Sequence, residues 1–187
     1  MTLVDSTIAD NEAVGDGGGL LFNNTVDLSF TNVTVNGNSA AGGAGLLLIN
    51  TGQLAFMNVT ISGNVAASEG GGIYSNNNIA GTIVNSTISG NSADRGGGLN
   101  SNNVFSVTVI NTIVAGNSAT SSGPDCYLAH DDFDSGGHNL IGDTTGCSFI
   151  AASGDQFGSS SFPLDPRLAL TCPPKIDPTL ELGFWDR

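Results

Sequence analysis

The stretch "STISGNSADRGGGLNSNN", residues 86–103, decides the fold of this chain because near-copies of it lie upstream. "VTVNGNSAAGGAGLLLIN" begins at Val33, and "VTISGNVAASEGGGIYSNN" begins at Val59. Each copy has an asparagine after a glycine, then a glycine cluster, then an apolar segment. Self-similarity at a fixed period is the signature of a repeat architecture.

The repeat has a fixed part and a variable part. Its glycine-flanked asparagines are Asn38, Asn64, Asn91 and Asn117, with Asn11 one step earlier, at spacings of 27, 26, 27 and 26 residues. The first apolar residue after each glycine cluster always lies 18 residues before the next of these asparagines, at Leu20, Leu46, Ile73 and Leu99. All length variation therefore falls between the asparagine and the glycines, which indicates one structural unit with one variable loop.

Aligned repeats show apolar columns two residues apart, which predict strands with one buried face. Three short strands fit into each period, and no segment has the 3.6-residue period of a helix. We therefore expect an all-β fold, a parallel β-helix (β-solenoid) of about five coils of 26–27 residues. The expected organisation is coils over 1–122, a disulfide-containing terminal coil or cap over 123–168, and an irregular C-terminal tail over 169–187.

Asparagines recur in three columns, each between strands, where a corner leaves backbone groups without sheet partners. A side-chain amide supplies both donor and acceptor, and asparagine tolerates the left-handed conformation of tight corners. We expect these residues to form structural ladders from coil to coil, with no catalytic role. The ladder residues are Asn24, Asn50, Asn77 and Asn103; Asn32, Asn58, Asn85 and Asn111; and Asn38, Asn64, Asn91 and Asn117.

The composition excludes several classes of partner. Four basic residues face seventeen acidic ones, for a formal net charge of -13. Nucleic acids and anionic membrane surfaces require lysine and arginine, so we expect neither as a partner. No apolar run approaches the roughly 18 residues of a membrane span, so no membrane insertion is expected.

The end of the chain resembles a known family. "NTIVAGNSATSSGPDCY" (111–127), "SGGHNLIGDTTGCSF" (135–149) and "LDPRL" (164–168) are similar to the terminal region of bacterial right-handed parallel β-helix repeat proteins of the choice-of-anchor and polymorphic outer-membrane-protein-like kind. The resemblance covers residues 1–168 and implies a right-handed coil and a secreted or cell-surface location. Beyond Leu168 the sequence departs from the family pattern.

The resemblance also implies that Cys126 and Cys147 pair. A bond closing a loop of about 20 residues stabilises by roughly 3 kcal/mol in the chain-entropy model and suits an oxidising compartment. Cys172 is left over, either free or intermolecular. A metal site of these cysteines with His130 and His138 is the alternative, although the close cysteine spacing of such sites is missing.

An acidic loop comes next, with Asp131, Asp132 and Asp134 close together. Carboxylates on a loop suit Ca²⁺, so these are weak candidate ligands, but the spacing matches neither an EF-hand nor the nine-residue calcium repeats. A solvated acidic loop is the simpler interpretation, and we expect no cofactor.

Catalysis is the main alternative, because parallel β-helices include pectate-lyase-like enzymes. Glu69, Asp94 and Arg95 are the candidate residues of a polysaccharide lyase or glycoside hydrolase. Glu69 and Asp94 lie in the variable loops of adjacent coils, as a pair of hydrolytic carboxylates would require. Aromatic residues that would bind a sugar are scarce, with Tyr74 the only outward one nearby, so we expect no enzyme.

A further alternative is binding to ice or to a polymer surface through an outward column at Thr7, Thr34, Thr60 and Thr87. Outward threonine is also ordinary strand chemistry. We expect a structural secreted or cell-surface module, serving as a stalk, an adhesin segment or a self-assembling filament unit. Because the first coil begins at Met1 without a polar cap, we expect self-association through that open coil. A polysaccharide is the other partner considered.

Overall fold

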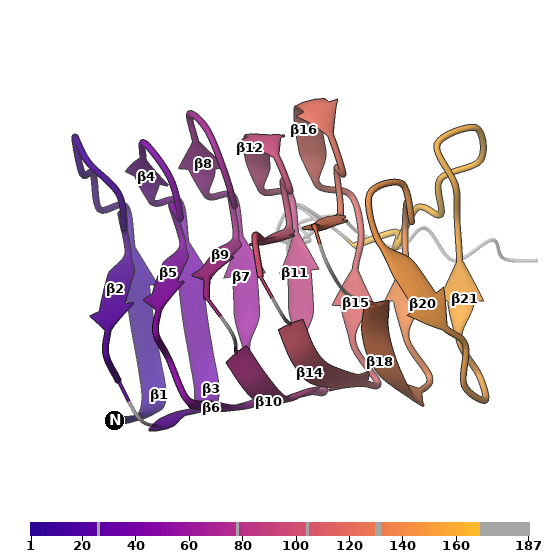
Figure 1. Ribbon diagram of the computed structural model, residues 1–187, viewed down its shortest axis with the longest axis horizontal. Helices are drawn as coiled ribbons and strands as arrows, with labels where there is room; N and C mark the ends of the chain where they lie inside the picture. Colours follow the sequence, from indigo (N-terminus) through magenta and orange to yellow (C-terminus); the bar gives the residue numbers. More distant parts are fainter. Residues whose placement is uncertain (26, 78, 104, 130–131, 169–187) are drawn as a thin grey trace, which may run out of the picture.

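The chain is a parallel β-solenoid in a computed structural model that describes residues 1–25, 27–77, 79–103, 105–129 and 132–168 (Figure 1). Every regular element of these residues is a β-strand. None of them forms a helix long and apolar enough to cross a membrane. The all-β fold expected from the repeat is confirmed.

The strands form three parallel sheets, here called A, B and C. Sheet A contains β1 (Thr2–Ala9), β3 (Asp27–Asn36), β6 (Gln53–Met57), β7 (Thr60–Ser62), β10 (Ile79–Val84), β11 (Thr87–Ser89), β14 (Phe105–Ile110), β15 (Ile113–Val114), β18 (Asp132–Gly137), β19 (Leu140–Ile141), β20 (Ser148–Ile150) and β21 (Gln156–Phe157). Sheet B contains β4 (Ser39–Ala40), β8 (Val65–Ala66), β12 (Ser92–Arg95) and β16 (Ser118–Ser122). Sheet C contains β2 (Leu20–Asn23), β5 (Leu46–Ile49), β9 (Ile73–Asn76), β13 (Leu99–Ser101) and β17 (Cys126–Leu128).

Sheet A bends in the middle of each coil. Strand β3 runs through the bend at Asn32, whereas the next coils split there into the pairs β6 and β7, β10 and β11, and β14 and β15. The three strands expected per coil are therefore the sheet C strand and the two segments of sheet A on either side of the asparagine corner, and the short sheet B strand is an additional one. The bend adds a fourth side to the cross-section.

The coil is right-handed. In Figure 1 the strands of sheet C lie in front and run downward, the β7 and β11 segments lie behind and run upward, and successive coils advance from left to right. This is the hand that the family resemblance implied. Sheet B, with its loops, forms the upper edge.

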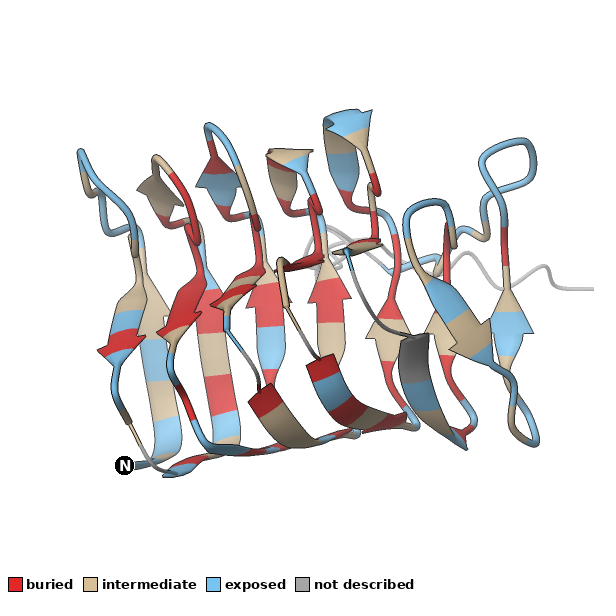
Figure 2. Ribbon diagram, viewed as in Figure 1, coloured by how far each residue is buried: buried red, intermediate tan, exposed pale blue. Residues whose placement is uncertain are grey.

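The register places the sequence columns directly above one another. Leu20 pairs with Leu46, Leu46 with Ile73, Ile73 with Leu99, and Leu99 with Cys126. The inward-facing residues of the middle coils are nearly all fully buried, and they form one continuous core (Figure 2). Phe30 and Phe56 stack within it, with ring centroids 4.6 Å apart. A column of small residues that includes Ala40, Ala66 and Ala93 lines sheet B, where Ala40 pairs with Ala66.

The last glycine of each cluster allows the coils to approach. A Cβ atom on Gly72 would come within 2.5 Å of the Gly98 carbonyl oxygen and 3.1 Å of the Asn91 Nδ2 atom. Gly45 and Gly98 meet the same two kinds of neighbour. These positions are therefore glycine because a ladder amide and a neighbouring backbone occupy the space of a side chain.

The C-terminal region continues the solenoid in part. Sheet B ends at β16, whereas sheet A continues through β18, β19, β20 and β21. The chain then lies against the last coils, where the Leu164 amide donates to the Gly142 carbonyl oxygen at 2.9 Å. Residues 169–187, the expected tail, and Cys172 with them, lie outside the described residues.

Candidate functional site

The most regular polar feature is a buried amide ladder at the end of the β7 arm, here called the interior ladder. It contains Asn11, Asn38, Asn64, Asn91 and Asn117. In each step the backbone N–H and the side-chain Nδ2 of one asparagine donate to the Oδ1 atom of the next, at 2.8–3.0 Å. The hydrogen bonds between successive ladder amides therefore all have their donors pointing toward the C-terminal end.

The second Nδ2 hydrogen reaches the backbone. Asn91 Nδ2 donates to the Ile61 carbonyl oxygen at 2.9 Å, and Asn64 Nδ2 donates to the Val35 carbonyl oxygen at 3.1 Å. Both amides are almost completely buried, so each hydrogen bond replaces one that water would otherwise have made. The structural role expected for this column is what the geometry gives it.

The interior ladder ends on a carboxylate. Asp125 Oδ1 accepts from the Asn117 backbone N–H at 2.9 Å and from Asn117 Nδ2 at 2.8 Å, and Asp125 Oδ2 accepts from the Asp143 N–H at 2.7 Å. Asp125 follows Gly72 and Gly98 in the column of the last cluster glycine. Its carboxylate lies where the next ladder amide would otherwise lie.

Burial raises the pKa of Asp125, and the hydrogen bonds from Asn117 and Asp143 offset this only in part. The donors that Asp125 receives favour the ionised form, but removal from water is the larger effect.

A second interior ladder follows the sheet A corner. The Val59 N–H donates to Ser86 Oγ, the Ser86 N–H to Thr112 Oγ1, and the Thr112 N–H to Asn139 Oδ1, at 2.9–3.2 Å. It also ends on a carboxylate, since the Asn139 N–H donates to Asp155 Oδ1 at 2.8 Å. Ser86 and Thr112 stand at the same repeat position as Val33 and Val59, so the apolar columns show no sign of this role.

The pKa of Asp155 is shifted in the opposite direction from that of Asp125. Its partial burial raises its pKa, but hydrogen bonds from Ser135, Asn139 and the Ala152 N–H outweigh that effect, so the pKa lies below its ordinary value.

The two outer ladders run the other way. In the corner ladder, Asn58 Nδ2 donates to Asn32 Oδ1 at 3.1 Å, and Asn32 Nδ2 donates to Asp5 Oδ1 at 2.8 Å. In the ladder between sheets C and A, Asn50 Nδ2 donates to Asn24 Oδ1 at 3.1 Å. Their donors point toward the N-terminal end. In the corner ladder and in both interior ladders, an aspartate accepts the last hydrogen bond at the end toward which the donors point.

These outer asparagines have the backbone conformation expected of them. Positive φ angles of 46° to 96° occur at Asn24, Asn32, Asn50, Asn58, Asn77, Asn85 and Asn111. Asn103 does not share this conformation, and its carbonyl oxygen accepts the Ser101 hydroxyl at 2.9 Å.

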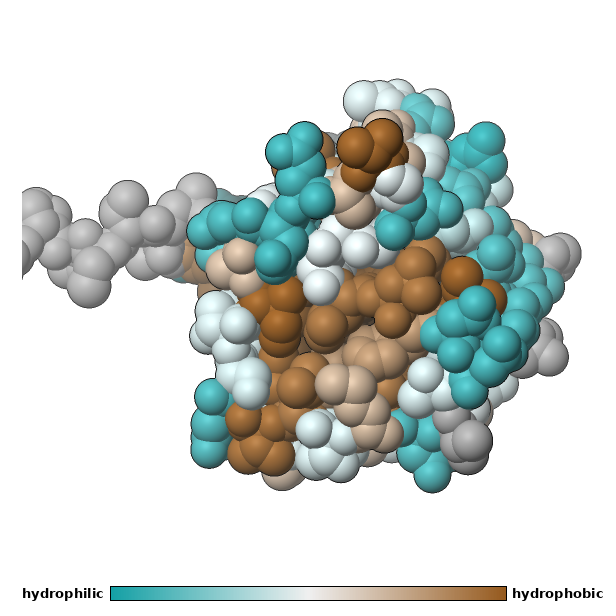
Figure 3. All heavy atoms as spheres, turned by 90° about the vertical axis from the view of Figure 1, so that its left-hand side faces the viewer, coloured by the Kyte–Doolittle hydropathy of each residue, from teal (hydrophilic) through white to brown (hydrophobic). Residues whose placement is uncertain are grey.

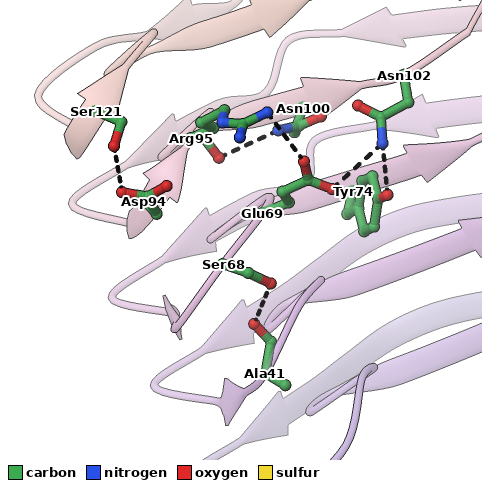
Figure 4. A network of polar contacts seen from close by, with 9 residues as sticks. All are labelled: Ala41, Ser68, Glu69, Tyr74, Asp94, Arg95, Asn100, Asn102 and Ser121. Atoms are coloured by element: carbon green, nitrogen blue, oxygen red, sulfur yellow. Dashed lines mark hydrogen bonds and ion pairs between the residues drawn. The ribbon is translucent and has the colours of Figure 1, made fainter.

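The catalytic candidates separate into two groups (Figure 4). Arg95 lies 3.6 Å from Glu69 in an ion pair between adjacent coils, and Asn102 Nδ2 donates both to Glu69 Oε2 at 3.2 Å and to the Tyr74 hydroxyl at 2.7 Å. Burial raises the pKa of Tyr74, and the neighbouring Glu69 raises it further. We call Glu69, Tyr74, Arg95 and Asn102 the Glu69 cluster.

Asp94 points away from this cluster, toward the following coil (Figure 4). Its Oδ1 atom accepts from Ser121 Oγ at 2.5 Å and from Thr120 Oγ1 at 2.6 Å, and these bonds lower its pKa. The structure therefore brings Glu69 together with Arg95 but leaves Asp94 apart. The two carboxylates do not face each other across a shared space.

The cysteine pair and the acidic loop have separate outcomes. Cys126 and Cys147 form a disulfide, with Cα atoms 5.7 Å apart, as the resemblance implied. His130 and Asp131 lie outside the described residues, and Asp132 and Asp134 lie on β18. Within the described part of the chain, no group of three or more His, Cys, Asp or Glu residues is placed to hold a metal ion.

The threonine column also forms. Thr7, Thr34, Thr60 and Thr87 pair in register on one arm of sheet A. The column beside it, which contains Ala9, Asn36, Ser62, Ser89 and Ala115, ends at Ala115, which is fully buried. The flat face is therefore interrupted at its C-terminal side.

Residues 58–76 match the repeat of the Chlamydia polymorphic membrane protein family. This segment contains one full set of structural positions: corner Asn58, ladder Asn64, glycines 70–72 and strand β9. No curated protein matches the chain, and no solved structure does. The chain is thus a β-helix repeat protein that resembles the polymorphic membrane proteins.

Proposed function

We propose that this chain is a non-catalytic structural module of a secreted or cell-surface protein, acting as a stiff stalk or adhesin segment. The observation that carries the proposal is that the polar side chains considered as candidates bond to neighbouring coils. The four interior asparagines from Asn38 to Asn117 bond to the coils on both sides, and the charged candidates Glu69, Arg95 and Asp94 bond to neighbouring coils as well.

Such a molecule functions through its length and its surface. Each coil contacts its neighbours through parallel strands and ladders, so the rod resists bending without needing a large core. The match to a polymorphic membrane protein repeat supports a surface location, and the disulfide fits an oxidising compartment.

Protease treatment of intact native cells tests the location. Peptides from this chain should be released into the supernatant before the cells lyse and identified by mass spectrometry. Recovery only after lysis, with a known surface protein cleaved in the same sample, would contradict the proposal.

A polysaccharide assay tests the absence of catalysis. The purified chain should release neither reducing ends nor unsaturated products from uronate-rich or neutral polysaccharides. If products form and Glu69→Gln abolishes them while Glu12→Gln does not, the protein is an enzyme and the structural proposal fails. Glu12 is the matched control because its side chain is exposed on the first coil.

Carbohydrate binding without catalysis is a second candidate, favoured by the Glu69 cluster. It places an aromatic ring, a carboxylate, a guanidinium group and an amide together on the outside of sheet C, and sugar sites combine these groups. Calorimetric titration with oligosaccharides checks it. Binding should disappear in Tyr74→Ala and persist in Tyr127→Ala, its counterpart two coils away in the same outward column.

A further inference from the structure

The N-terminal end of the solenoid exposes positions that are buried in every middle coil. Leu20 and Leu3 are partly exposed, whereas their partners one coil on, Leu46 and Phe30, are fully buried. Figure 3 looks onto this end and shows an apolar centre surrounded by polar side chains. We call this surface, formed by Leu3, Ile8, Leu20 and the edges of β1 and β2, the open end.

The backbone at the open end is also available. Strand β1 has eight residues and, among the described strands, pairs only with β3. Strand β2 likewise pairs only with β5 in that part of the chain. An edge strand of this length presents N–H and C=O groups on which another strand can pair.

The ladders add a specific hydrogen-bonding pattern to the open end. Among the described residues nothing donates to Asn11 Oδ1, although the equivalent oxygen of Asn38 receives two N–H donors. Asn24 Nδ2 has no acceptor within the same set, although the equivalent Asn50 Nδ2 has one. Asp5 uses one oxygen for Asn32, and as a carboxylate it has no N–H to offer outward.

The occupant must therefore offer complementary groups. It needs N–H donors above Asn11, an acceptor above Asn24, and a donor or a cation above Asp5. The C-terminal edge of a solenoid coil has the first two, because interior ladder donors point toward the C-terminal end and outer ladder acceptors face the same way.

A second copy of this chain does not fit head to tail. Among the described residues, its interior ladder donors are already taken by Asp125 and Asp155, so they are not available to Asn11 of the next copy. The formal charge of -13 on each copy adds repulsion.

We propose that the open end binds the C-terminal edge of another β-solenoid coil, one whose ladder asparagine still has free N–H groups. The coil joins in the parallel register that connects the coils of this chain. This rests on the proposed structural function. It differs from simple self-association because the ladders select which end of which coil can dock.

The test is to supply such a coil. Met1 occupies the same column position as Leu28 and Leu54, so a copy of residues Leu28–Gln53 fused directly before Met1 adds one coil in register. The copied Asn38 then donates to Asn11, and the copied Asn50 accepts from Asn24. The thermal midpoint should rise, and the β1 amides should exchange with deuterium at least about tenfold more slowly.

Two controls isolate the ladder chemistry. Deleting Gly52 from the copied coil shifts its register by one residue and turns its inward side chains outward, so the protection of β1 should be lost. Changing the copied Asn38 to Leu keeps the register but removes the donors above Asn11, and the rise in the midpoint should shrink. Adding Asp5→Asn to the in-register fusion should raise the midpoint further, because the copied Asn32 oxygen then gains a donor.

Three results would overturn the proposal. One is equal protection of β1 in the in-register and shifted fusions. Another is concentration-dependent growth of wild-type filaments in light scattering, which would mean that head-to-tail copies do fit. The last is a wild-type dimer that the in-register fusion abolishes, which would make a second copy the occupant. None of these depends on where the protein resides or on whether it is an enzyme, so the proposed function can fail separately.

Discussion

A single interior asparagine forms hydrogen bonds to other coils through both its side chain and its backbone N–H. Asn91 donates to Asn117 through both its backbone and its side chain, donates to the Ile61 carbonyl oxygen, and accepts two bonds from Asn64. All of these groups are buried, so removing the amide leaves several neighbours without a partner at once.

We expect Asn91→Leu to lower the free energy of unfolding by about 1–3 kcal/mol, since the Asn64 N–H groups and the Ile61 carbonyl oxygen lose their partner in a dry site. Urea denaturation measures the change. Asn36→Leu is the control, because Asn36 is an exposed residue of β3 and should shift the midpoint little. An unchanged midpoint for Asn91→Leu would refute the energetic role of the ladder.

The two ladder-end carboxylates predict opposite pH dependences. Asp155 has a lowered pKa in the folded protein. Its contribution to stability is therefore present above pH 3.8, the ordinary pKa of an aspartate, and is lost as the pH falls through the folded-state pKa. Asp125 has a raised pKa in the folded protein. Its contribution to stability is therefore complete below pH 3.8 and is lost as the pH rises through the folded-state pKa.

Unfolding free energies of wild type, Asp155→Asn and Asp125→Asn across an acidic pH series check this. The advantage of wild type over Asp155→Asn should shrink with acidification, whereas wild type should gain on Asp125→Asn. Parallel curves for the two variants would mean that the environments are not distinct.

Single residues also mark the limit of prediction from this sequence. The ladder from Asn38 to Asn117 was predictable because it repeats. Asp125 was not, because it occurs once, in a glycine column, and reaches the ladder only by taking the place of an amide in the next coil. The ladder role of Ser86 and Thr112 was not predictable, because Val33 and Val59 precede them in the same column.

Among the elements, the turn into sheet C leaves no room for a side chain at its last glycine. Gly72 lies under the Gly98 carbonyl oxygen and beside Asn91 Nδ2, and neither neighbour can move without breaking the stack. We expect Gly72→Ala to destabilise by about 1–3 kcal/mol through overpacking. Gly15→Ala is the matched control, since a Cβ there meets nothing within 4 Å. Denaturant midpoints of the two variants should differ clearly, and equal midpoints would contradict the close approach.

The disulfide joins β17 to the turn before β20. Its sequence separation is 21 residues, and reducing it should cost roughly 3 kcal/mol of stability in the chain-entropy model. Peptide mapping without reductant should recover Cys126 linked to Cys147, and Cys172→Ser should leave both the map and the stability unchanged. A Cys172 bridge to either cysteine would refute this pairing.

Elements were predictable in proportion to their repetition. The apolar columns predicted sheets A and C in the right register, from Leu20 to Leu99. The division of sheet A at Asn58 and Asn85 was predicted, because that asparagine column marks a corner between strands. The short strands of sheet B were not, because only small residues such as Ala40 and Ala66 mark them in the sequence. The Glu69–Arg95 pair was missed because sequence spacing does not show which way a loop side chain points.

For the whole molecule, the coils behave as interchangeable units. Deleting Thr60–Ser86 joins Val59 to Thr87, which occupies the same column as Thr60, so the shortened chain should keep its β-sheet circular dichroism. Its denaturant m-value should fall, because less surface becomes exposed on unfolding. Deleting Thr60–Gly72 instead would join sheet A to sheet C and should abolish cooperative unfolding. Cooperative unfolding of both deletions would refute the modular description.

Asp125 has a consequence for how a gene of this kind changes length. Duplicating a unit upstream of Asn117 inserts a complete rung and leaves the final carboxylate in its place, so the longer rod is as well terminated as the shorter one. Duplicating a unit that includes Asp125 would instead place a second buried aspartate in the middle of the rod, at a position that is a glycine in the other coils. Duplication of repeat units is therefore tolerated upstream of the Asp125 codon, and it destabilises the protein when the duplicated unit includes that codon. Related genes should differ in coil number upstream of that codon and keep a constant length downstream of it.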